Sequence, residues 1–100
     1  MDERQLVFEE FSGKVGQSFV VCDDGLPAIA MELRQAQLLN PAFALPNVRS
    51  PFSLTFIASD QRILPQGLYR LDNQGTGIVT IFLVPAAKDA SGVTYHATFN

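Results

Sequence analysis

Hydrophobic and polar residues alternate along several short stretches of the chain, as in strands that place one face on a core. The clearest alternation covers Phe52–Ser59, and a second covers Val93–Phe99. Ile57 is the one large apolar residue on the outward face of the first stretch. Both stretches predict strands, and their core-facing residues are Phe52, Leu54, Phe56 and Ala58 in the first and Val93, Tyr95, Ala97 and Phe99 in the second.

The stretch Gly77–Pro85 is apolar without alternation, and it carries no charged residue. Its residues are mostly β-branched or aromatic, which favours a pleated and buried surface. Periodicity alone does not distinguish so short a run from a buried helix, but its β-branching and its flanking Gly and Pro favour a strand. We therefore expect a central strand, buried on both faces, that ends at Pro85.

Two shorter signals place neighbours beside this central strand. Leu68–Asp72 is a candidate strand with Tyr69 and Leu71 on one face, and the turn-forming residues Asn73–Gly77 follow it. Lys88–Gly92 forms a second connection, to the closing strand. The sequence therefore predicts a meander of three strands over Leu68–Phe99, with the central strand in its middle.

The N-terminal stretch Asp2–Phe11 predicts a short helix. Phe8 and Phe11 are three residues apart, so one helical turn places both rings on one face. Asp2 is a suitable cap for its start, and Gly13 is a suitable end. An edge strand over Leu6–Phe8 is the alternative.

Between the N-terminal stretch and Phe52, the sequence predicts a strand, an ambiguous segment and a loop. Gly16–Cys22 predicts a strand, and the turn Asp23-Asp24-Gly25 follows it. Ala28–Leu39 has the composition of a helix, yet its first half alternates, with Ile29, Met31 and Leu33 on one face, and we favour a strand. Asn40–Pro51 contains three prolines and predicts a long loop, either packed on the core or available for binding.

About six strands at short spacing indicate an all-β fold. One hundred residues support a single domain, residues 1–100, with one core. We expect a small antiparallel barrel or sandwich with a short N-terminal helix. The order of the strands is not readable from these patterns, so barrel and sandwich stay open.

Charge and cysteine content narrow the class of protein. The net charge is −3 with 17% charged residues and no basic patch, which argues against nucleic acid or an anionic membrane as a partner. Cys22 is the only cysteine, Met1–Arg4 lacks the start of a signal peptide, and no apolar run approaches the roughly 20 residues of a membrane helix. We expect a soluble cytoplasmic protein, while secretion without a cleaved signal stays open.

Candidate chemistry is sparse. His96 is the only histidine and faces outward among threonines, so a structural role is favoured over a catalytic one. One His and one Cys far apart do not make a zinc site, and the Asp23-Asp24-Gly25 turn lacks the spaced carboxylates of a calcium loop. Gly75 and Gly77 precede a strand, where a phosphate-binding loop needs a helix. We expect no metal, no cofactor and no enzymatic activity.

Several phrases of the sequence together resemble a family of small, functionally uncharacterised bacterial domains, sometimes encoded near phage tail-collar-like proteins. The resemblance covers Phe11 to Asn100 and implies a compact all-β domain that is part of a tail-like or surface assembly. It transfers no catalytic or ligand-binding residue. The phrases are Phe11 with Val15-Gly16-Gln17 and Phe19, Phe52-Ser53-Leu54 with Phe56, Leu64-Pro65-Gln66-Gly67 with Tyr69, and Ile81-Phe82-Leu83-Val84-Pro85 with Tyr95-His96-Ala97-Thr98-Phe99-Asn100.

Three classes of function remain. The favoured one is a non-enzymatic structural or protein-interaction module, which would bind a protein partner or form a homodimer through a strand edge or an apolar patch. The second is a small-ligand or peptide binder that uses a barrel mouth near the loop Asn40–Pro51. The third, and least favoured, is a hydrolase-type enzyme that uses His96. The weak candidates for binding residues are Tyr69, Arg70, Tyr95 and His96.

Overall fold

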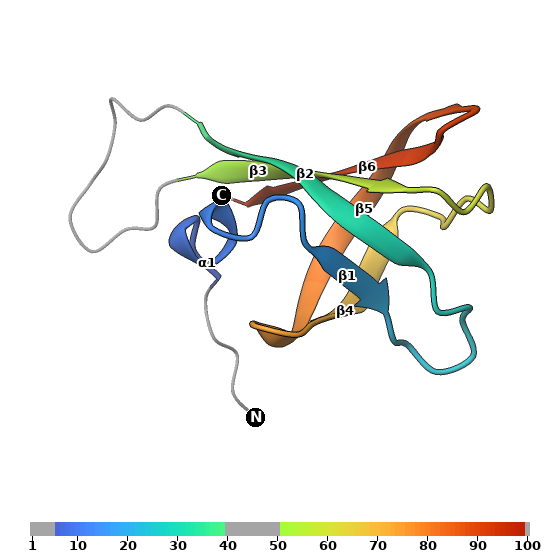
Figure 1. Ribbon diagram of the computed structural model, residues 1–100, viewed down its shortest axis with the longest axis horizontal. Coiled ribbons are helices and arrows are strands. Elements are labelled where there is room, and N and C mark those ends of the chain that lie inside the picture. Colours follow the sequence, from blue (N-terminus) through green and yellow to red (C-terminus); the bar gives the residue numbers. More distant parts are fainter. Residues whose placement is uncertain (1–5, 40–50, 100) are drawn as a thin grey trace.

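The computed structural model describes residues 6–39 and 51–99, and it forms a closed antiparallel barrel of six strands (Figure 1). The expected all-β fold is therefore confirmed, and the barrel is chosen over the sandwich. Asp2 and most of the expected loop Asn40–Pro51 lie outside the described residues. The elements in chain order are α1 (Glu9–Ser12), β1 (Ser18–Val21), β2 (Ala30–Leu38), β3 (Phe52–Ala58), β4 (Gly67–Asn73), β5 (Gly77–Asp89) and β6 (Gly92–Phe99).

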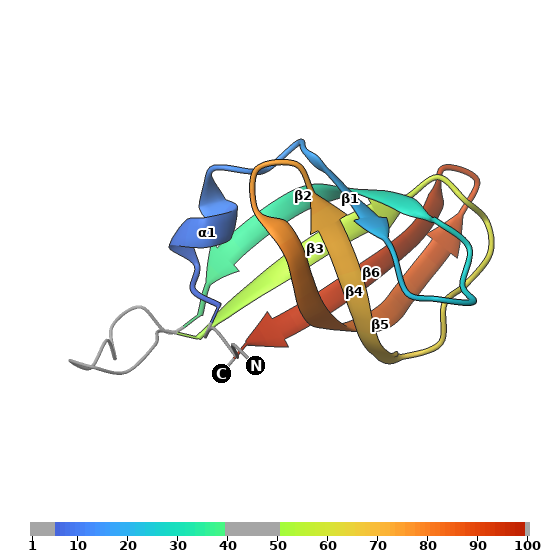
Figure 2. The ribbon, with the colours of Figure 1, turned by 90° about the horizontal axis from the view of Figure 1, so that it is seen from below.

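The strands follow the order β1-β2-β3-β6-β5-β4 around the barrel, and β1 pairs with β4 to close it. The expected meander is confirmed, because β5 pairs with β4 on one side and with β6 on the other. On its other side β6 pairs with β3, from Phe52↔Phe99 to Ala58↔Val93. Figure 2 shows β1, β4 and β5 side by side on the near side of the barrel.

The core lies inside the barrel and is built from the inward-facing residue of every second position. The alternation expected for β3 and β6 is confirmed. Every second residue of β3 is buried, and of the inward residues of β6, Val93, Tyr95 and Ala97 are buried and Phe99 is partly exposed. The largest fully buried side chains come from α1, from all six strands and from Ile29 just before β2: Tyr95, Phe11, Phe19, Phe52, Phe56, Ile29, Met31, Leu33, Leu54, Leu71, Ile81 and Leu83.

The expectation that Gly77–Pro85 is buried on both faces is wrong. Val79, Ile81 and Leu83 face the core, but Ile78 and Phe82 lie on the outer face and are 52% and 44% exposed. The reason is the closed barrel, since each strand of a single-layered barrel has only its inner face on the core. A strand is buried on both faces only where a second layer covers its sheet.

Pro85 also does not end this strand, because β5 continues to Asp89. The pairing register of β5 with β6 shifts between Pro85 and Ala87. Such a bulge leaves one residue out of the regular ladder, so a proline without an N–H is tolerated there. The expected connection Lys88–Gly92 is correspondingly shorter, since both its ends belong to strands.

The ambiguous segment Ala28–Leu39 is a strand, as favoured. Its residues Ala30–Leu38 form β2, and Ile29 just before the strand is buried together with Met31 and Leu33 of the strand. The alternation therefore outweighs the helical composition, because burying three large side chains contributes more free energy than intrinsic helix propensity.

The short N-terminal helix is confirmed as a single turn, α1, at one end of the barrel beside the ends of β2 and β3 (Figure 1). Its Phe11 is fully buried. The ring centroids of Phe8 and Phe11 lie 6.2 and 6.0 Å from that of Phe52, so both rings lie on one face as expected. The alternative strand over Leu6–Phe8 does not form.

Candidate interaction surface

The seam between β1 and β4 closes the barrel with a short ladder. Val20 pairs with Asp72 and Val21 with Leu71, and the Cys22 N–H donates to the Arg70 carbonyl at 2.9 Å. By contrast, β4 and β5 pair along the full length of β4. A ladder this short needs further contacts, and side chains supply them at both of its ends.

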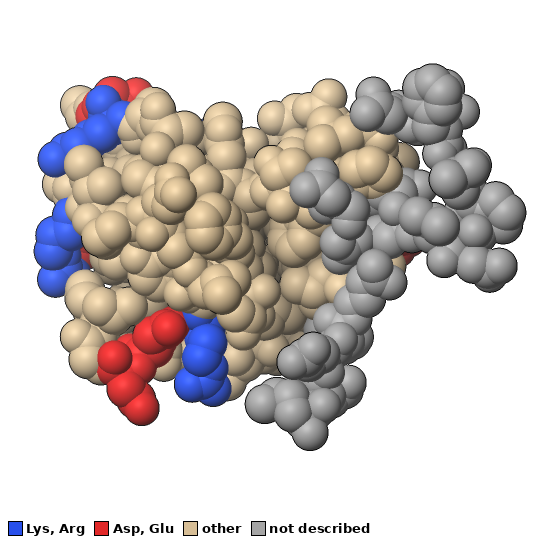
Figure 3. Space-filling view, turned by 180° about the vertical axis from the view of Figure 1, so that it is seen from behind, with Lys and Arg blue, Asp and Glu red and all other residues tan. Residues whose placement is uncertain are grey.

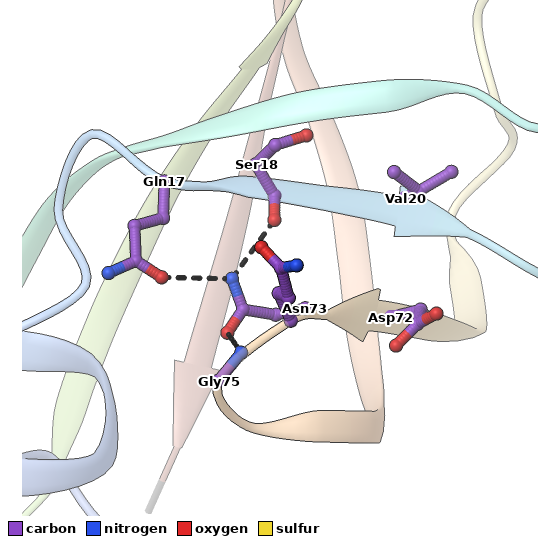
Figure 4. Close-up of a pocket in the computed structure, with 7 residues that line it drawn as sticks. Gln17, Ser18, Val20, Asp72, Asn73 and Gly75 are labelled. Atoms are coloured by element: carbon purple, nitrogen blue, oxygen red, sulfur yellow. Dashed lines mark hydrogen bonds between the residues drawn. The ribbon is translucent and has the colours of Figure 1, made fainter.

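Asn73 fixes one end of the seam (Figure 4). Its side chain is buried, and its Nδ2 donates to the Ser18 carbonyl at 3.0 Å and to the Gln17 side chain at 3.2 Å. Its Oδ1 accepts the backbone N–H groups of Gly75 and Thr76, both at 3.0 Å. One amide therefore holds the β4–β5 turn in shape and ties it to β1, so its hydrogen-bonding capacity is used within the protein.

Asp23 fixes the other end. Its Oδ1 accepts the Arg70 N–H at 2.6 Å, and so continues the ladder after β1 has ended. The expected Asp23-Asp24-Gly25 turn is present, with Gly25 at a φ of 80°. Asp23 therefore serves the fold as a side-chain substitute for a backbone acceptor.

A surface groove of about 680 Å³ lies over this seam. It is lined by Gln17, Ser18, Val20, Asp72, Asn73, Gln74 and Gly75, five of which have polar side chains. The Asn73 amide is already hydrogen-bonded, so the exposed side chains of Gln17, Ser18, Asp72 and Gln74 are the polar groups that can meet a ligand, and the Asp72 carboxylate is the one charged group among them.

The outer face of β4 and β5 carries an apolar surface, here called the β4–β5 patch and defined by Leu68, Ile78 and Phe82. Leu68 and Phe82 are directly opposite each other across the two strands. Their side chains are 66% and 44% exposed, and that of Ile78 is 52% exposed. Large apolar side chains that lie opposite each other across two strands usually face a core. The exposure of Leu68 and Phe82 therefore marks this surface as unusual.

Two charged residues of opposite sign lie within the same face. Arg70 and Asp72 follow Leu68 at every second position of β4, and they pair across to Thr80 and Ile78 of β5. Within the described part of the chain, neither the Arg70 guanidinium nor the Asp72 carboxylate forms an ion pair or a hydrogen bond. The face therefore presents one free positive and one free negative group beside its apolar pair.

The strands that follow β4 around the barrel carry almost no charge. β3 and β6 contain no Asp, Glu, Lys or Arg, and β5 contains none before Lys88. Figure 3 shows the corresponding face, whose broad centre is uncharged, with the charged side chains at its rim. A solvated barrel wall ordinarily carries charges of both signs, so this wall is low in solubilising groups.

Of the candidate residues, Tyr69 and Tyr95 lie inside the barrel. The Tyr95 hydroxyl accepts the Leu64 N–H at 3.0 Å and donates to the Arg62 carbonyl at 3.4 Å. The Tyr69 hydroxyl donates to the Pro65 carbonyl. Burial raises the pKa of Tyr69, with smaller contributions from Tyr95 and Asp23. Both tyrosines thus hold the loop between β3 and β4 against the core.

Arg70 and His96 lie on the outer face, on different strands. His96 is exposed on β6 between Thr55 of β3 and Val84 of β5. The structure therefore separates the four candidates into two interior and two exterior residues, and their role in binding stays a prediction. No cluster of three metal-ligating side chains occurs among the described residues.

Sequence reasoning did not single out Leu68, Ile78 or Phe82. The available signal was the period of two in β5, where Ile78, Thr80 and Phe82 share one face and Val79, Ile81 and Leu83 the other. Both faces are rich in apolar residues, so the pattern did not separate a core face from an exposed one. Knowledge of barrel closure is needed to make that distinction.

Taken together, these features define a small closed β-barrel domain with an exposed apolar face on one hairpin. The chain belongs to a family described as a domain of unknown function (DUF6916), whose model matches residues 6–99. The expected resemblance to an uncharacterised family is thereby confirmed. No curated protein and no solved structure matches the chain. Among the residues that the structure describes, no helix has the length and apolar composition needed to cross a membrane.

Proposed function

We propose that the protein is a non-enzymatic interaction module that binds a protein partner through the β4–β5 patch. The observation that carries the proposal is the exposed cross-strand pair of Leu68 and Phe82. Covering two such side chains would contribute about 1.5–3 kcal/mol each where burial is complete. No enzymatic chemistry is part of the proposal, and no catalytic role is given to His96.

The setting of the patch supports this proposal. Interfaces are enriched in aromatic residues and depleted of charge at their centres, with polar residues at the rim. Phe82 lies on the outer face of β5, which has no charged residue before Lys88, whereas Arg70 and Asp72 lie beside it on β4. The arrangement thus fits an apolar centre with a charged margin.

We also propose, on the resemblance alone, that the protein is bacterial and an accessory of a phage-tail-like or surface assembly. A repetitive assembly needs domains that bind neighbours without chemistry, which fits a rigid barrel with one exposed apolar face. The genomic neighbourhood tests this part of the proposal directly: genes for tail or surface proteins beside this gene would support it, and their absence would count against it.

The seam groove favours a second candidate function, a binder of a small ligand or peptide. Its volume of about 680 Å³ is within the range of ligand pockets. Asp72 and Gln74 would contact the ligand, so a cationic or amide-bearing compound fits best. A fragment screen followed by amide chemical shifts tests it: shifts confined to Gln17, Ser18 and Gln74 support the binder, and their absence counts against it.

Site-specific photo-cross-linking tests the interaction module. A photoreactive amino acid replaces Thr80, in the middle of the β4–β5 patch, and in a matched control it replaces Gln37, which is exposed on β2. In cells that express the protein, we expect a discrete adduct from position 80 and none from position 37. No adduct at position 80, or equal labelling from both positions, would contradict the proposal. His96→Ala should leave the adduct unchanged.

A further inference from the structure

We infer that the partner bound by the β4–β5 patch is a second copy of this chain, related by a two-fold axis. The inference rests on the proposed function and names the partner of the same surface. It follows from the order of the residues on the patch, which is complementary to itself.

The outward residues of β4 and β5 form three cross-strand rows: Leu68 with Phe82, Arg70 with Thr80, and Asp72 with Ile78. Consider two copies stacked face to face, with the two-fold axis between them parallel to the strands. This axis exchanges the positions of β4 and β5 but keeps the rows aligned. Leu68 of each copy then lies over Phe82 of the other, and the four side chains form one apolar cluster.

The same axis brings opposite charges together. Arg70 of one copy lies diagonally across from Asp72 of the other, one row away, and the long guanidinium side chain spans that offset. Two reciprocal ion pairs result, formed by groups that have no partner within the described part of a single chain. Exposed ion pairs add little affinity, so the apolar cluster supplies the binding free energy and the charges fix the register.

The size of the face sets the expected affinity. A two-stranded face buries less than the roughly 800 Å² per partner of a standard specific interface. We therefore expect a weak dimer with a dissociation constant on the order of 10–100 μM. Sedimentation velocity from about 5 μM to about 1 mM covers the monomer and the dimer.

The apolar contribution is tested with the double variant Leu68→Ser/Phe82→Ser. Both side chains are outside the core, so its circular dichroism and unfolding midpoint should stay close to those of the parent. Its dissociation constant should rise at least about tenfold. The matched control is Leu26→Ser, which removes an apolar side chain that is 42% exposed in the loop between β1 and β2, and it should dimerise like the parent.

The charge contribution is tested by mixing two variants. Arg70→Asp leaves two acidic groups beside the patch, on the outer face of β4, and Asp72→Arg leaves two basic groups there. Each variant alone should dimerise more weakly than the parent, because both diagonal pairs become repulsive. An equimolar mixture should form a heterodimer, since every diagonal pair is again of opposite sign. If the outer face of β4 and β5 takes no part in self-association, the mixture gives no such recovery.

A parent protein that remains monomeric at about 1 mM would overturn the inference. A dimer that is unaffected by Leu68→Ser/Phe82→Ser, or charge variants that do not recover on mixing, would overturn it as well. The cross-link at position 80 separates this failure from that of the proposed function. An adduct with a different protein sustains the interaction module and excludes self-association, and an adduct of twice the chain mass supports both.

Discussion

The Asn73 side-chain nitrogen donates to the carbonyl oxygen of Ser18 at 3.0 Å, across 55 residues of sequence. This contact joins the end of β4 to the start of β1, where the backbone ladder of the seam has only two paired positions. Barrel closure therefore depends on one buried amide as well as on strand pairing. The same amide also shapes the turn into β5, so closure and hairpin geometry are coupled.

We expect Asn73→Ala to lower the free energy of unfolding by about 2–4 kcal/mol, because it leaves several buried polar groups without partners. Urea unfolding monitored by circular dichroism measures this change. The matched control is Gln74→Ala, an exposed neighbour in the same turn, whose effect should stay within about 0.5 kcal/mol. Equal effects of the two substitutions would contradict the structural role of Asn73.

The two faces of β5 should respond oppositely to charge. Ile81→Asp and Leu83→Asp place an unpaired carboxylate in the core, and we expect either to unfold the domain, since the penalty reaches the total stability of a domain of about 5–15 kcal/mol. Thr80→Asp, on the outer face of the same strand, should remain folded. Amide NMR spectra of the three variants show which of them remain folded. A folded Ile81→Asp variant would contradict the placement of Ile81 in the barrel core.

Gly92 permits a close approach of two strands. Its φ is 138°, and a Cβ there would overlap the Ala58 carbonyl of β3. Gly92→Ala must displace backbone as well as adopt a strained conformation, so we expect a loss of more than about 3 kcal/mol in unfolding free energy. Gly25→Ala, whose Cβ would meet nothing within 4 Å, should lose only about 1–2 kcal/mol. Parallel thermal or urea unfolding curves test the difference.

The loop after β3 should show a defined response to acid. Hydrogen bonds from the Arg62 side chain, and then from the Arg62 backbone N–H, lower the pKa of Asp60 from its ordinary 3.8 to about 2. Because the folded-state pKa is the lower one, the bridge stabilises the loop above about pH 3.8 and is lost as the pH falls through about 2.

A carboxyl-carbon NMR titration of the protein measures this pKa. Arg62→Ala should raise the Asp60 midpoint toward 3.8. The pKa of Asp89 is lowered by hydrogen bonds from Ser91 instead, so its midpoint should not change in this variant. An Asp60 midpoint that is unaffected by Arg62→Ala would show that the bridge does not form.

Much of the fold was predictable because local patterns determine it. In β3, β6 and the first half of β2, apolar and polar residues alternate with the period of a strand, and tertiary structure confirms each of them. The meander of β4, β5 and β6 followed from turn-forming residues between neighbouring strands. Such contacts are close in sequence, so composition and spacing are sufficient to find them.

The seam and the patch were not predictable for the opposite reason. The pairing of Val20 with Asp72 joins distant parts of the chain, and the sequence of neither strand indicates which strand it pairs with. Without that pairing, both faces of β5 are rich in large apolar residues, and the exposure of Ile78 and Phe82 could not be inferred. Barrel closure is the missing information in both cases.

The separation between the two sides of the seam also has a consequence during synthesis. β1 leaves the ribosome about fifty residues before its partner β4 and the Asn73 amide. Until then, β1 has β2 as its only strand neighbour among the described strands, so the barrel that encloses Phe19 and Val21 cannot close. Nascent chains arrested before Gly67 should therefore be protease-sensitive throughout, and resistance should appear only when the β4–β5 hairpin has emerged.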